Sequence, residues 1–295
     1  TKKVVLETVL SVYEGEIALE NRGSGMESLI KTEIALEKSN GLDVILMEEP
    51  ENHLSFTTLR KMLEGISEKQ KNSQIIVATH NSMIASRLNL NNVLWITESC
   101  VKPLTGVNEK VADFFVRADD NGFLQLLLSK RVFLVEGATE FLLLPHFYQQ
   151  ITGKTIEDDG ISVISCNGIS YKKYLEIAEK TDKKIAVITD NDKAQEKIDF
   201  AKKYNEKNTM QHIYMADSTD DWTWEICMYH ANQAALDQLI KVRAGAEYKY
   251  HGESYGTVPG KMLNNKVDVA YQMLTSGTVF EIPQYVKDAI EWLRK

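Results

Sequence analysis

The stretch VFLVEGATEFLLLPHF, from Val132 to Phe147, joins an apolar, β-branched run to two carboxylates. The residues Arg131–Val135 have the composition of a buried strand, and Glu136 follows at its carboxyl end. Glu140 comes one helical turn later, at the start of an apolar helix. Because ligands of open α/β sheets bind at the carboxyl ends of strands, this pair of acids is placed to hold a divalent metal ion.

A second strand with terminal acids occurs downstream in KKIAVITDNDK, where Asp190 and Asp192 close an apolar run. Strand and helix patterns alternate throughout this half of the chain, which predicts a parallel sheet flanked by helices. The expected strands are Arg131–Val135, Ile161–Ser165, Lys184–Thr189 and Gln211–Met215, and the expected helices are Glu140–Thr152, Tyr171–Thr181 and Ala194–Lys207.

The remaining sequence predicts two further regions and a connector. The first hundred residues predict a helix from Met26 to a cap at Asn40–Gly41, a strand Val44–Met47, a helix Ser55–Lys69, a strand ending on His80 and a strand Asn91–Thr97. The C-terminal part predicts a helix Trp222–Ala244, a Gly- and Tyr-rich loop Gly245–Gly260 and helices within Asn264–Arg294, interrupted at Gly277 and Pro283. The expected divisions are 1–100, a connector 101–130, a core 131–220 and a helical part 221–295.

Composition indicates a packed globular protein with two domains, since the chain has 295 residues and is 43% hydrophobic. The cysteines Cys100, Cys166 and Cys227 are odd in number and widely spaced. They suggest neither a zinc site nor a disulfide framework, and favour a reducing cytoplasm. No apolar run is long enough for a membrane span, and no signal peptide is evident. The chain lacks a starting methionine, so we expect a fragment or an internal start.

The net charge of −8 gives no general attraction to nucleic acid or to an anionic membrane. It suits a site that gathers acids around metal ions, although ordinary solubility explains it equally well.

The first hundred residues contain a separate group of polar residues. Glu48 and Glu49 end an apolar strand, where the first acid can hold Mg²⁺ and the second can polarise the water that attacks a γ-phosphate. His80, after the next strand, is placed to sense that phosphate, and Ser24–Gly25 opens a helix whose backbone N–H groups can bind an anion. Taken singly, the glycine-rich turn and the histidine have ordinary structural explanations.

The segments NRGSGMES, VILMEEPENHL and IIVATHN resemble the signature motif, the Walker B motif with D-loop and the switch histidine of an ABC/SMC-like ATPase head. Glu48 stands where many such ATPases have Asp, and Glu27 where the signature often has Gln. The sequence contains no GxxxxGK[ST] phosphate loop. We therefore expect that the nucleotide-binding N-terminal lobe is not part of this chain, and that the chain alone does not hydrolyse ATP.

VEGATE followed by TDND resembles the Toprim domain shared by topoisomerases, primases and nucleases of the OLD (overcoming lysogenisation defect) family. An ABC-like head followed by Toprim is the layout of OLD-family nucleases, including the large subunit of Gabija-type antiphage systems. The resemblance implies cleavage of DNA with Mg²⁺ or Mn²⁺, leaving a phosphate end. It also implies homo-oligomers, ATP-linked control in the intact protein, a helicase-like partner subunit and a role in antiphage defence or in DNA processing, with no membrane attachment.

Phosphodiester cleavage needs metal ions to neutralise charge and to ionise the attacking water. Glu136, Asp190 and Asp192 are expected to share one ion, while Glu140 serves a second ion or bridges both. Glu225 is a further candidate ligand of the second ion, with Asp220 and Asp221 behind it. The alternative for Glu140 and Glu225 is a solvated helix face. A cation is also needed near the scissile phosphate. The resemblance assigns it to Lys266, with Lys261 as the rival and a merely exposed lysine as the alternative for both. Gly168 is expected to let the backbone turn close to this edge.

Three aromatic residues have helical spacing: Trp222, Trp224 and Tyr229. A place in the hydrophobic core is the preferred interpretation, and stacking against nucleic-acid bases is the alternative. Tyr248, Tyr250, His251 and Tyr255, in the Gly- and Tyr-rich loop, are candidates to line a substrate groove, although an ordinary loop is the preferred interpretation.

The favoured hypothesis is a metal-dependent DNA endonuclease, an α/β protein in which part of an ABC-type ATPase lobe precedes a Toprim domain with a helical C-terminal appendage. One alternative is another Toprim phosphoryl transferase of the primase or topoisomerase kind, against which the ABC-like half argues. The other alternative is a non-catalytic, SMC-like assembly module that binds metal for structural reasons.

Overall fold

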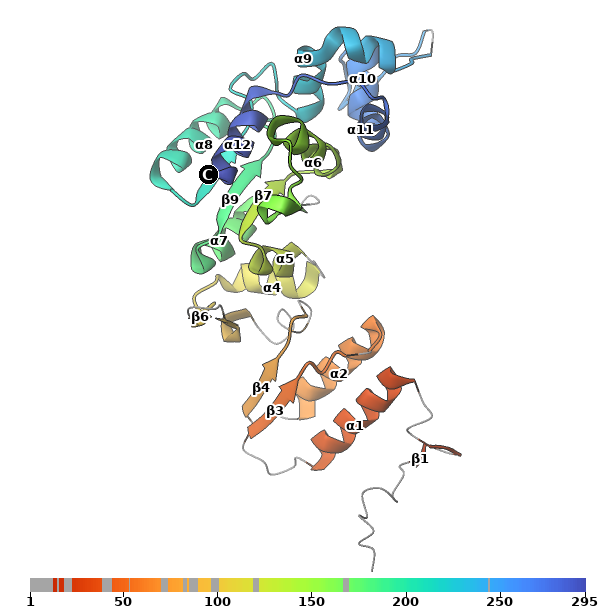
Figure 1. Ribbon diagram of the computed structural model, residues 1–295, viewed down its shortest axis with the longest axis vertical. Helices are drawn as coiled ribbons and strands as arrows, with labels where there is room; N and C mark the ends of the chain where they lie inside the picture. The colour runs from red at the N-terminus through yellow and green to blue at the C-terminus, as the bar shows by residue number, and fades with distance from the viewer. Residues whose placement is uncertain are drawn as a thin grey trace, which may run out of the picture. The chain divides into compact units, whose positions relative to one another are not determined.

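The computed structural model describes residues 13–14, 16–18, 23–38, 44–52, 54–69, 74–81, 84, 90–96, 101–118, 122–166, 170–243 and 245–295. Two compact units are distinguished (Figure 1). The first unit comprises Thr1–Val93 and Asn108–Asp120, and the second comprises Leu94–Val107 and Asn121–Lys295. The expected connector 101–130 thus contributes to both units. It contains β6 (Val101–Pro103), α4 (Glu109–Ala118) and α5 (Gly122–Leu128).

The first unit is built on two parallel strands, β3 (Val44–Glu48) and β4 (Gln74–Ala78). Helices α1 (Ser24–Lys38) and α2 (Phe56–Lys69) accompany them, together with the short hairpin β1 (Tyr13–Glu14) and β2 (Ile17–Ala18). One face of the strand pair packs on α2, because alternate side chains of a strand point to the same face. The residues in this cluster are Leu29, Ile45, Met47, Leu54, Leu59, Met62, Leu63, Ile75, Val77 and Ile84. On the opposite face Val44, Leu46 and Ile76 are exposed.

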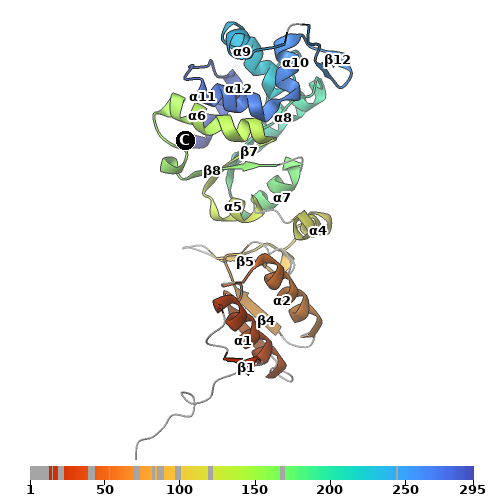
Figure 2. The ribbon, with the colours of Figure 1, turned by 90° about the vertical axis from the view of Figure 1, so that its right-hand side faces the viewer.

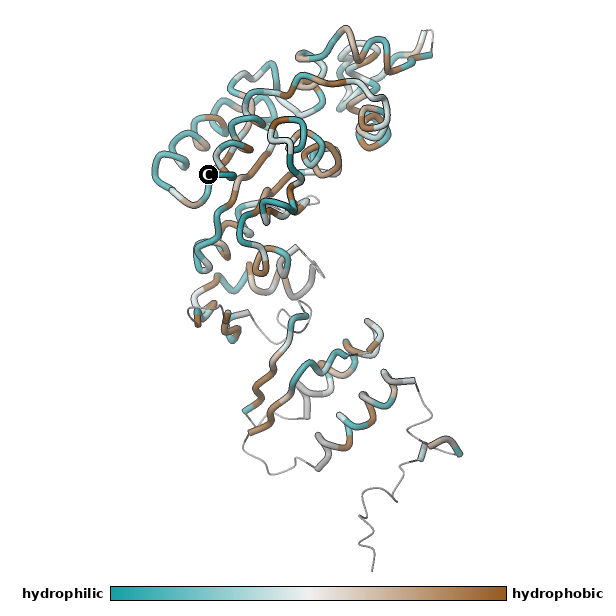
Figure 3. The backbone as a smooth tube through the Cα atoms, in the orientation of Figure 1, coloured by the Kyte–Doolittle hydropathy of each residue, from teal (hydrophilic) through white to brown (hydrophobic). Residues whose placement is uncertain are grey.

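The second unit contains a four-stranded sheet of β7 (Arg131–Val135), β8 (Ile161–Ser165), β9 (Lys184–Ile188) and β10 (Gln211–Tyr214). Its order is β10-β9-β7-β8, and all neighbouring strands are parallel. The predicted parallel sheet flanked by helices is confirmed. The two central strands, β7 and β9, are buried on both faces, as their continuous apolar runs indicate (Figure 3). A separate antiparallel pair joins β5 (Leu94–Ile96) to β6.

Helices cover both faces of this sheet. One face, which includes Phe133, Val135, Ala186 and Ile188, packs against α6 (Ala138–Thr152) and α12 (Gln284–Arg294). From β7 to β8 the chain moves one way across the sheet, and from β8 to β9 and then to β10 it moves the other way. Because such crossovers are right-handed, α7 (Tyr171–Thr181) and α8 (Gln195–Lys207) lie on the face opposite to α6. Figure 2 shows α6 and α12 on one side of β7 and β8, with α7 on the other.

The C-terminal part contains more structure than the sequence indicated. Helix α9 (Trp224–Leu239) is shorter than the predicted Trp222–Ala244 and is kinked at Asn232, which has non-helical φ and ψ. The Asn232 side chain explains the kink, because it donates to Met228 O at 3.0 Å and to Glu281 O at 2.9 Å.

The predicted loop 245–260 instead contains a hairpin of β11 (Lys249–Tyr250) and β12 (Glu253–Ser254) and the beginning of α10 (Thr257–Asn264). Helix α11 (Lys266–Thr275) follows, and the break before α12 lies at the predicted Gly277 and Pro283.

Two other boundaries differ from the predictions. Strand β4 ends at Ala78, so His80 lies beyond it, and the strand expected at Asn91–Thr97 begins as the 3₁₀ helix η3 (Leu90–Asn92) before β5. In both cases the pairing with a neighbouring strand sets the boundary, and the apolar pattern of the sequence alone does not predict it. Among the described residues, no helix is long and apolar enough to cross a membrane.

Replacing Phe133 with alanine is expected to lower the free energy of unfolding of the second unit by about 3–5 kcal/mol, because the ring is fully buried between β7 and α6. The matched control is Phe141→Ala, since Phe141 is 45% exposed on α6 and should cost less than about 1 kcal/mol. All four tryptophans belong to the second unit, so tryptophan fluorescence during urea unfolding reports on it alone. Equal losses in the two variants would contradict this packing.

Candidate active site

The candidate site lies where β7 and β9 end side by side. These strands are paired in register, with Val135 opposite Ile188, so the residues that follow them meet at one edge of the sheet. The chain leaves β7 toward α6 on one face and leaves β9 toward α8 on the other. This divergence opens a crevice between the two connections, which is the usual ligand position in an open α/β sheet.

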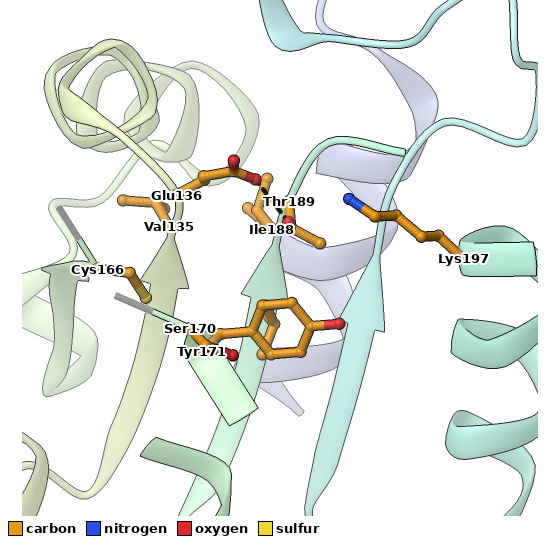
Figure 4. Close-up of a pocket in the computed structure, with 9 residues that line it drawn as sticks. Val135, Glu136, Cys166, Ser170, Tyr171, Ile188, Thr189 and Lys197 are labelled. Atoms are coloured by element: carbon orange, nitrogen blue, oxygen red, sulfur yellow. Dashed lines mark hydrogen bonds between the residues drawn. The ribbon is translucent and has the colours of Figure 1, made fainter. Parts of the chain in front are cut away.

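Glu136 spans this crevice. Its Oε2 atom accepts a hydrogen bond from Thr189 Oγ1 at 2.6 Å and another from the backbone N–H of Asp190 at 3.1 Å. Figure 4 shows Glu136 pointing across to Thr189, with Tyr171 and Lys197 among the other residues that line a cavity of about 250 Å³. The carboxylate of one strand end therefore holds the neighbouring strand end in place.

Three helices begin at the same edge and bring further charged groups to it. Glu140 lies in the first turn of α6, Glu225 in the first turn of α9, and Lys266 at the first position of α11. The N-terminus of a helix carries partial positive charge, which favours a carboxylate there. Glu140 Oε2 accepts from Gly137 N–H at 3.2 Å and so caps its own helix.

Glu140 and Glu225 are only 5% and 3% exposed, so the solvated helix face considered for both is wrong. Glu225 accepts from Thr139 Oγ1 at 3.3 Å and from Thr223 Oγ1 at 3.0 Å, and its Oε2 lies 3.0 Å from Lys266 Nζ. Lys266 is therefore the counter-ion of a buried carboxylate. Lys261, its rival, donates instead to the backbone carbonyl of Lys241 at 2.6 Å.

Burial and mutual repulsion of the carboxylates change their protonation. Burial, opposed in part by a backbone hydrogen bond and reinforced by the charges of Glu225 and Glu136, raises the pKa of Glu140 to about 7. Burial and the charges of Glu140, Glu225 and Glu136 also raise the pKa of Asp190 well above its usual value. Burial alone would lower the pKa of Lys266, yet Glu225 and Asp190 raise it to about 12. The site thus contains more carboxyl groups than Lys266 can neutralise, and the raised pKa values favour protonation of Glu140 and Asp190.

The loop after β9 is held in an unusual conformation. Asp192 and Lys193 have positive φ angles of 51° and 63°, which L-residues rarely adopt. The buried side chain of Asn191 stabilises this loop: its Nδ2 donates to the carbonyls of Ala216, Ser218 and Asp221, and its Oδ1 accepts from Lys193 N–H at 2.9 Å. Asn191 was not singled out from the sequence, although its place between two acids was a signal.

The two acids of this loop point to different partners. Asp190 Oδ1 accepts from the backbone N–H of Trp224 at 2.9 Å, which joins it to the start of α9. The Asp192 carboxylate forms an ion pair with Lys197 of α8. The structure therefore gathers Glu136, Glu140, Asp190 and Glu225 around Lys266, while the Asp192 carboxylate pairs with Lys197.

These residues fit a hard divalent cation in their donor chemistry, because carboxylate oxygens and uncompensated negative charge are what Mg²⁺ and Mn²⁺ require. Their arrangement does not enclose one, since each carboxylate is turned toward its own hydrogen-bond donor. Within the described ranges, no three His, Cys, Asp or Glu side chains are close enough together to hold a metal ion. In this arrangement Glu225 is paired with Lys266 and Asp192 with Lys197.

A cavity of about 360 Å³ opens beside the acids. Glu136, Asp190, Asp192 and Lys266 line one part of it, and an aromatic group of Trp222, Tyr250 and Tyr255 lines another. The prediction that Trp222 belongs to the hydrophobic core is wrong, because Trp222 lines this cavity. The same prediction for Trp224 is confirmed, because Trp224 is 1% exposed and packs in the core. The expected Gly168 lies outside the described residues.

In the first unit, the structure brings together two of the residues assigned to an ATPase. Glu49 Oε1 lies 3.2 Å from His80 Nδ1, and Asn52 Nδ2 donates to Glu49 Oε2 at 2.8 Å. Hydrogen bonds from Asn52 and His80 lower the pKa of Glu49. Glu48 ends β3 on an exposed position, and Gly25 lies in the first turn of α1. The side chain of Ser24 is not among those described.

Solved structures and a curated protein resemble parts of this chain. The C-terminal region of the Burkholderia pseudomallei OLD protein is 15% identical, with a TM-score of 0.41, over 57% of this chain and 98% of that one. The C-terminal region of the Xanthomonas campestris pv. campestris OLD protein is 15% identical, with a TM-score of 0.39, over 58% and 94%.

The Old nuclease of Escherichia phage P2 is 24% identical over 174 residues, which are 55% of this chain and 27% of the phage protein. The family model that matches is "Overcoming lysogenization defect protein-like, TOPRIM domain", over residues 127–192. The matched residues include β7, Glu136, Glu140 and the loop with Asp190 and Asp192. Residues 127–192 thus carry an OLD-like TOPRIM domain.

Proposed function

We propose that this chain is a metal-dependent endonuclease that hydrolyses phosphodiester bonds of DNA. The observation that carries the proposal is the convergence of four carboxylates and Lys266 at the adjacent ends of β7 and β9. The OLD-like TOPRIM match and the similarity to a phage nuclease support it. Activity, substrate and partners are proposals, because the chain spans only 27% of that relative's length.

Glu136, Asp190 and Asp192 are assigned to one divalent ion, and Glu140 and Glu225 to a second. Bound Mg²⁺ or Mn²⁺ would ionise a water molecule and neutralise charge on the phosphate. Glu136 joins the ends of β7 and β9 through its hydrogen bond with Thr189, and Asn191 holds the loop that carries both neighbouring aspartates. These contacts hold the backbone that carries the ligands, while the carboxylates of Glu225 and Asp192 are paired with Lys266 and Lys197.

Lys266 is assigned to the scissile phosphate. Its Nζ pairs with Glu225, and its raised pKa keeps it charged across the physiological range. A fixed ammonium group at this position stabilises the negative charge that develops on the phosphate oxygens.

Control by nucleotide belongs to the same proposal. The contact between Glu49 and His80 supports an ABC-type ATPase lobe that binds ATP in the intact protein and regulates cleavage. The proposal also includes homo-oligomerisation, a helicase-like partner subunit and a role in antiphage defence. Because this chain is acidic, we assign part of the DNA path to another protomer or subunit.

One observation favours the non-catalytic alternative. Lysines already neutralise Glu225 and Asp192, so the acids have protein partners without a metal. A scaffold in which these ion pairs are permanent would show neither cleavage nor a metal requirement. Another Toprim transferase, of the primase or topoisomerase kind, would require metal but would not hydrolyse plasmid DNA.

Glu136→Gln and Asp190→Asn should each reduce nicking of supercoiled plasmid DNA in Mg²⁺ or Mn²⁺ by about 100-fold or more, because each removes charge from the expected ion ligands. The matched control is Glu206→Gln, an exposed acid of α8, which should cleave like the wild type. Gel electrophoresis of the products measures the rate. Equal cleavage by all four proteins would contradict the assignment of the site.

Lys266→Ala should lower the cleavage rate at saturating metal by about 10²- to 10³-fold, since one stabilising donor at the phosphate is lost. Lys261→Ala should leave the cleavage rate within about two-fold of the wild type. The reason is that Lys261 Nζ donates to the backbone carbonyl of Lys241, after the end of α9, and not to the acids. Thermal unfolding with metal present checks that both variants are folded. Loss of cleavage in Lys261→Ala with a normal Lys266→Ala would reverse the assignment.

A further inference from the structure

An aromatic group stands directly beside the acids. The rings of Trp222 and Tyr255 have centroids 5.3 Å apart, and those of Trp222 and Tyr250 are 6.0 Å apart. Tyr250 belongs to β11 and Tyr255 follows β12, so the hairpin brings two tyrosines against one tryptophan. All three line the cavity of about 360 Å³ that also contains Glu136, Asp190 and Lys266.

The group is not part of the hydrophobic core. Trp222, Tyr250 and Tyr255 are all half-buried. Trp224, two residues from Trp222, is in contrast 1% exposed and stacks on Phe147 with centroids 6.1 Å apart. Half-exposed aromatic side chains in a polar cavity retain apolar faces that a ligand can cover.

The backbone fixes Trp222 relative to the acids. The carbonyl of Trp222 accepts a hydrogen bond from Asp192 N–H at 3.1 Å, and the N–H of Trp224 donates to Asp190 Oδ1 at 2.9 Å. The tryptophan is thus joined on both sides to residues assigned to the metal site. A base on its ring would belong to a nucleotide next to the scissile phosphate.

Cationic groups surround these rings. Lys193 Nζ lies 4.9 Å from the Trp222 ring centroid and 5.0 Å from that of Tyr255, and Lys266 Nζ lies 5.9 Å from that of Tyr250. Lys193 also donates to Tyr255 Oη at 2.8 Å and pairs with Glu253 at 3.2 Å. Aromatic faces with adjacent cations are the combination by which proteins bind unpaired nucleotides.

We propose that Trp222, Tyr250 and Tyr255 form a stacking subsite for an unpaired nucleobase of the DNA strand that the acids cleave, an inference that rests on the proposed nuclease function. Both faces of a base inside a duplex are covered by its neighbours. Only a base in a single strand, at a mismatch or turned out of the helix presents a face to this subsite. The substrates are therefore DNA strands with an unpaired nucleotide beside the cleaved bond.

The test measures binding separately from cleavage. A fluorescein-labelled oligo(dT) of about 12 nucleotides, within the usual span of such sites, is titrated with the 295-residue chain in EDTA and followed by fluorescence anisotropy. Trp222→Ala and Tyr250→Ala should each raise the dissociation constant by about ten-fold, since each removes a stacking face. Trp222→Phe should stay within about three-fold of the wild type, because a ring remains.

Two controls make the result specific. Tyr271→Ala removes a tyrosine that is 63% exposed on α11, outside this cavity, and should leave the dissociation constant unchanged. Binding of a perfectly paired duplex should differ little between the wild type and Trp222→Ala. Unchanged oligo(dT) binding in Trp222→Ala, or an equal loss for single strand and duplex, would overturn the stacking subsite.

The outcomes also separate this inference from the proposed function. Metal-dependent cleavage by the wild type, with oligo(dT) binding unaffected by Trp222→Ala, would refute the subsite and leave the nuclease. Weaker binding by Trp222→Ala in a chain that cleaves no DNA with any metal would support the subsite and refute the nuclease.

Discussion

The hydrogen bonds from Thr189 and Asp190 to Glu136 are the interaction on which the site depends. They join the ends of β7 and β9, which are neighbours in space but separated in the chain by β8 and α7. The two connections leave on opposite faces of the sheet, so the crevice between them exists only while these strand ends stay together. Removal of Glu136 therefore affects both the ligand set and the geometry that presents it.

The balance of charge follows from the same arrangement. Helices α6, α9 and α11 all begin at this edge, and their first turns contribute Glu140, Glu225 and Lys266. Burial of several carboxylates is unfavourable without a cation, and Lys266 compensates for only part of the charge. Helix dipoles and local donors such as Thr139 and Thr223 reduce the remaining cost. A divalent ion would complete this compensation.

Much of the second unit could be predicted from its sequence, because local patterns decide it. The run at Arg131–Val135 is apolar on both faces, and Ile161–Ser165 combines three apolar residues with two serines after the turn residue Gly160. Both predicted strands are confirmed. Glu136 and Asp190 follow such runs directly, so their meeting at one edge follows from the parallel sheet.

Other features depend on contacts that no local pattern encodes. The ion pair of Asp192 with Lys197 depends on the conformation of the loop after β9. The hydrogen bond from Asn191 to the backbone carbonyl of Ala216 depends on a segment that is distant in the sequence. Trp222 and Trp224 look alike in sequence, yet one lines a cavity and the other fills the core, because α9 begins only at Trp224. The hairpin that carries Tyr250 forms within a Gly-rich segment whose composition predicts only a loop.

Manganese binding tests the central claim most directly, since the claim is that this edge of the sheet is a metal site. The free Mn²⁺ signal in electron paramagnetic resonance, followed as the wild-type chain is added, reports binding without any need for substrate. The account predicts binding in the millimolar range or tighter, competition by Mg²⁺, and marked weakening in the double variant Glu136→Gln/Asp190→Asn. Absence of binding to the wild type, or equal binding to the double variant, would contradict it.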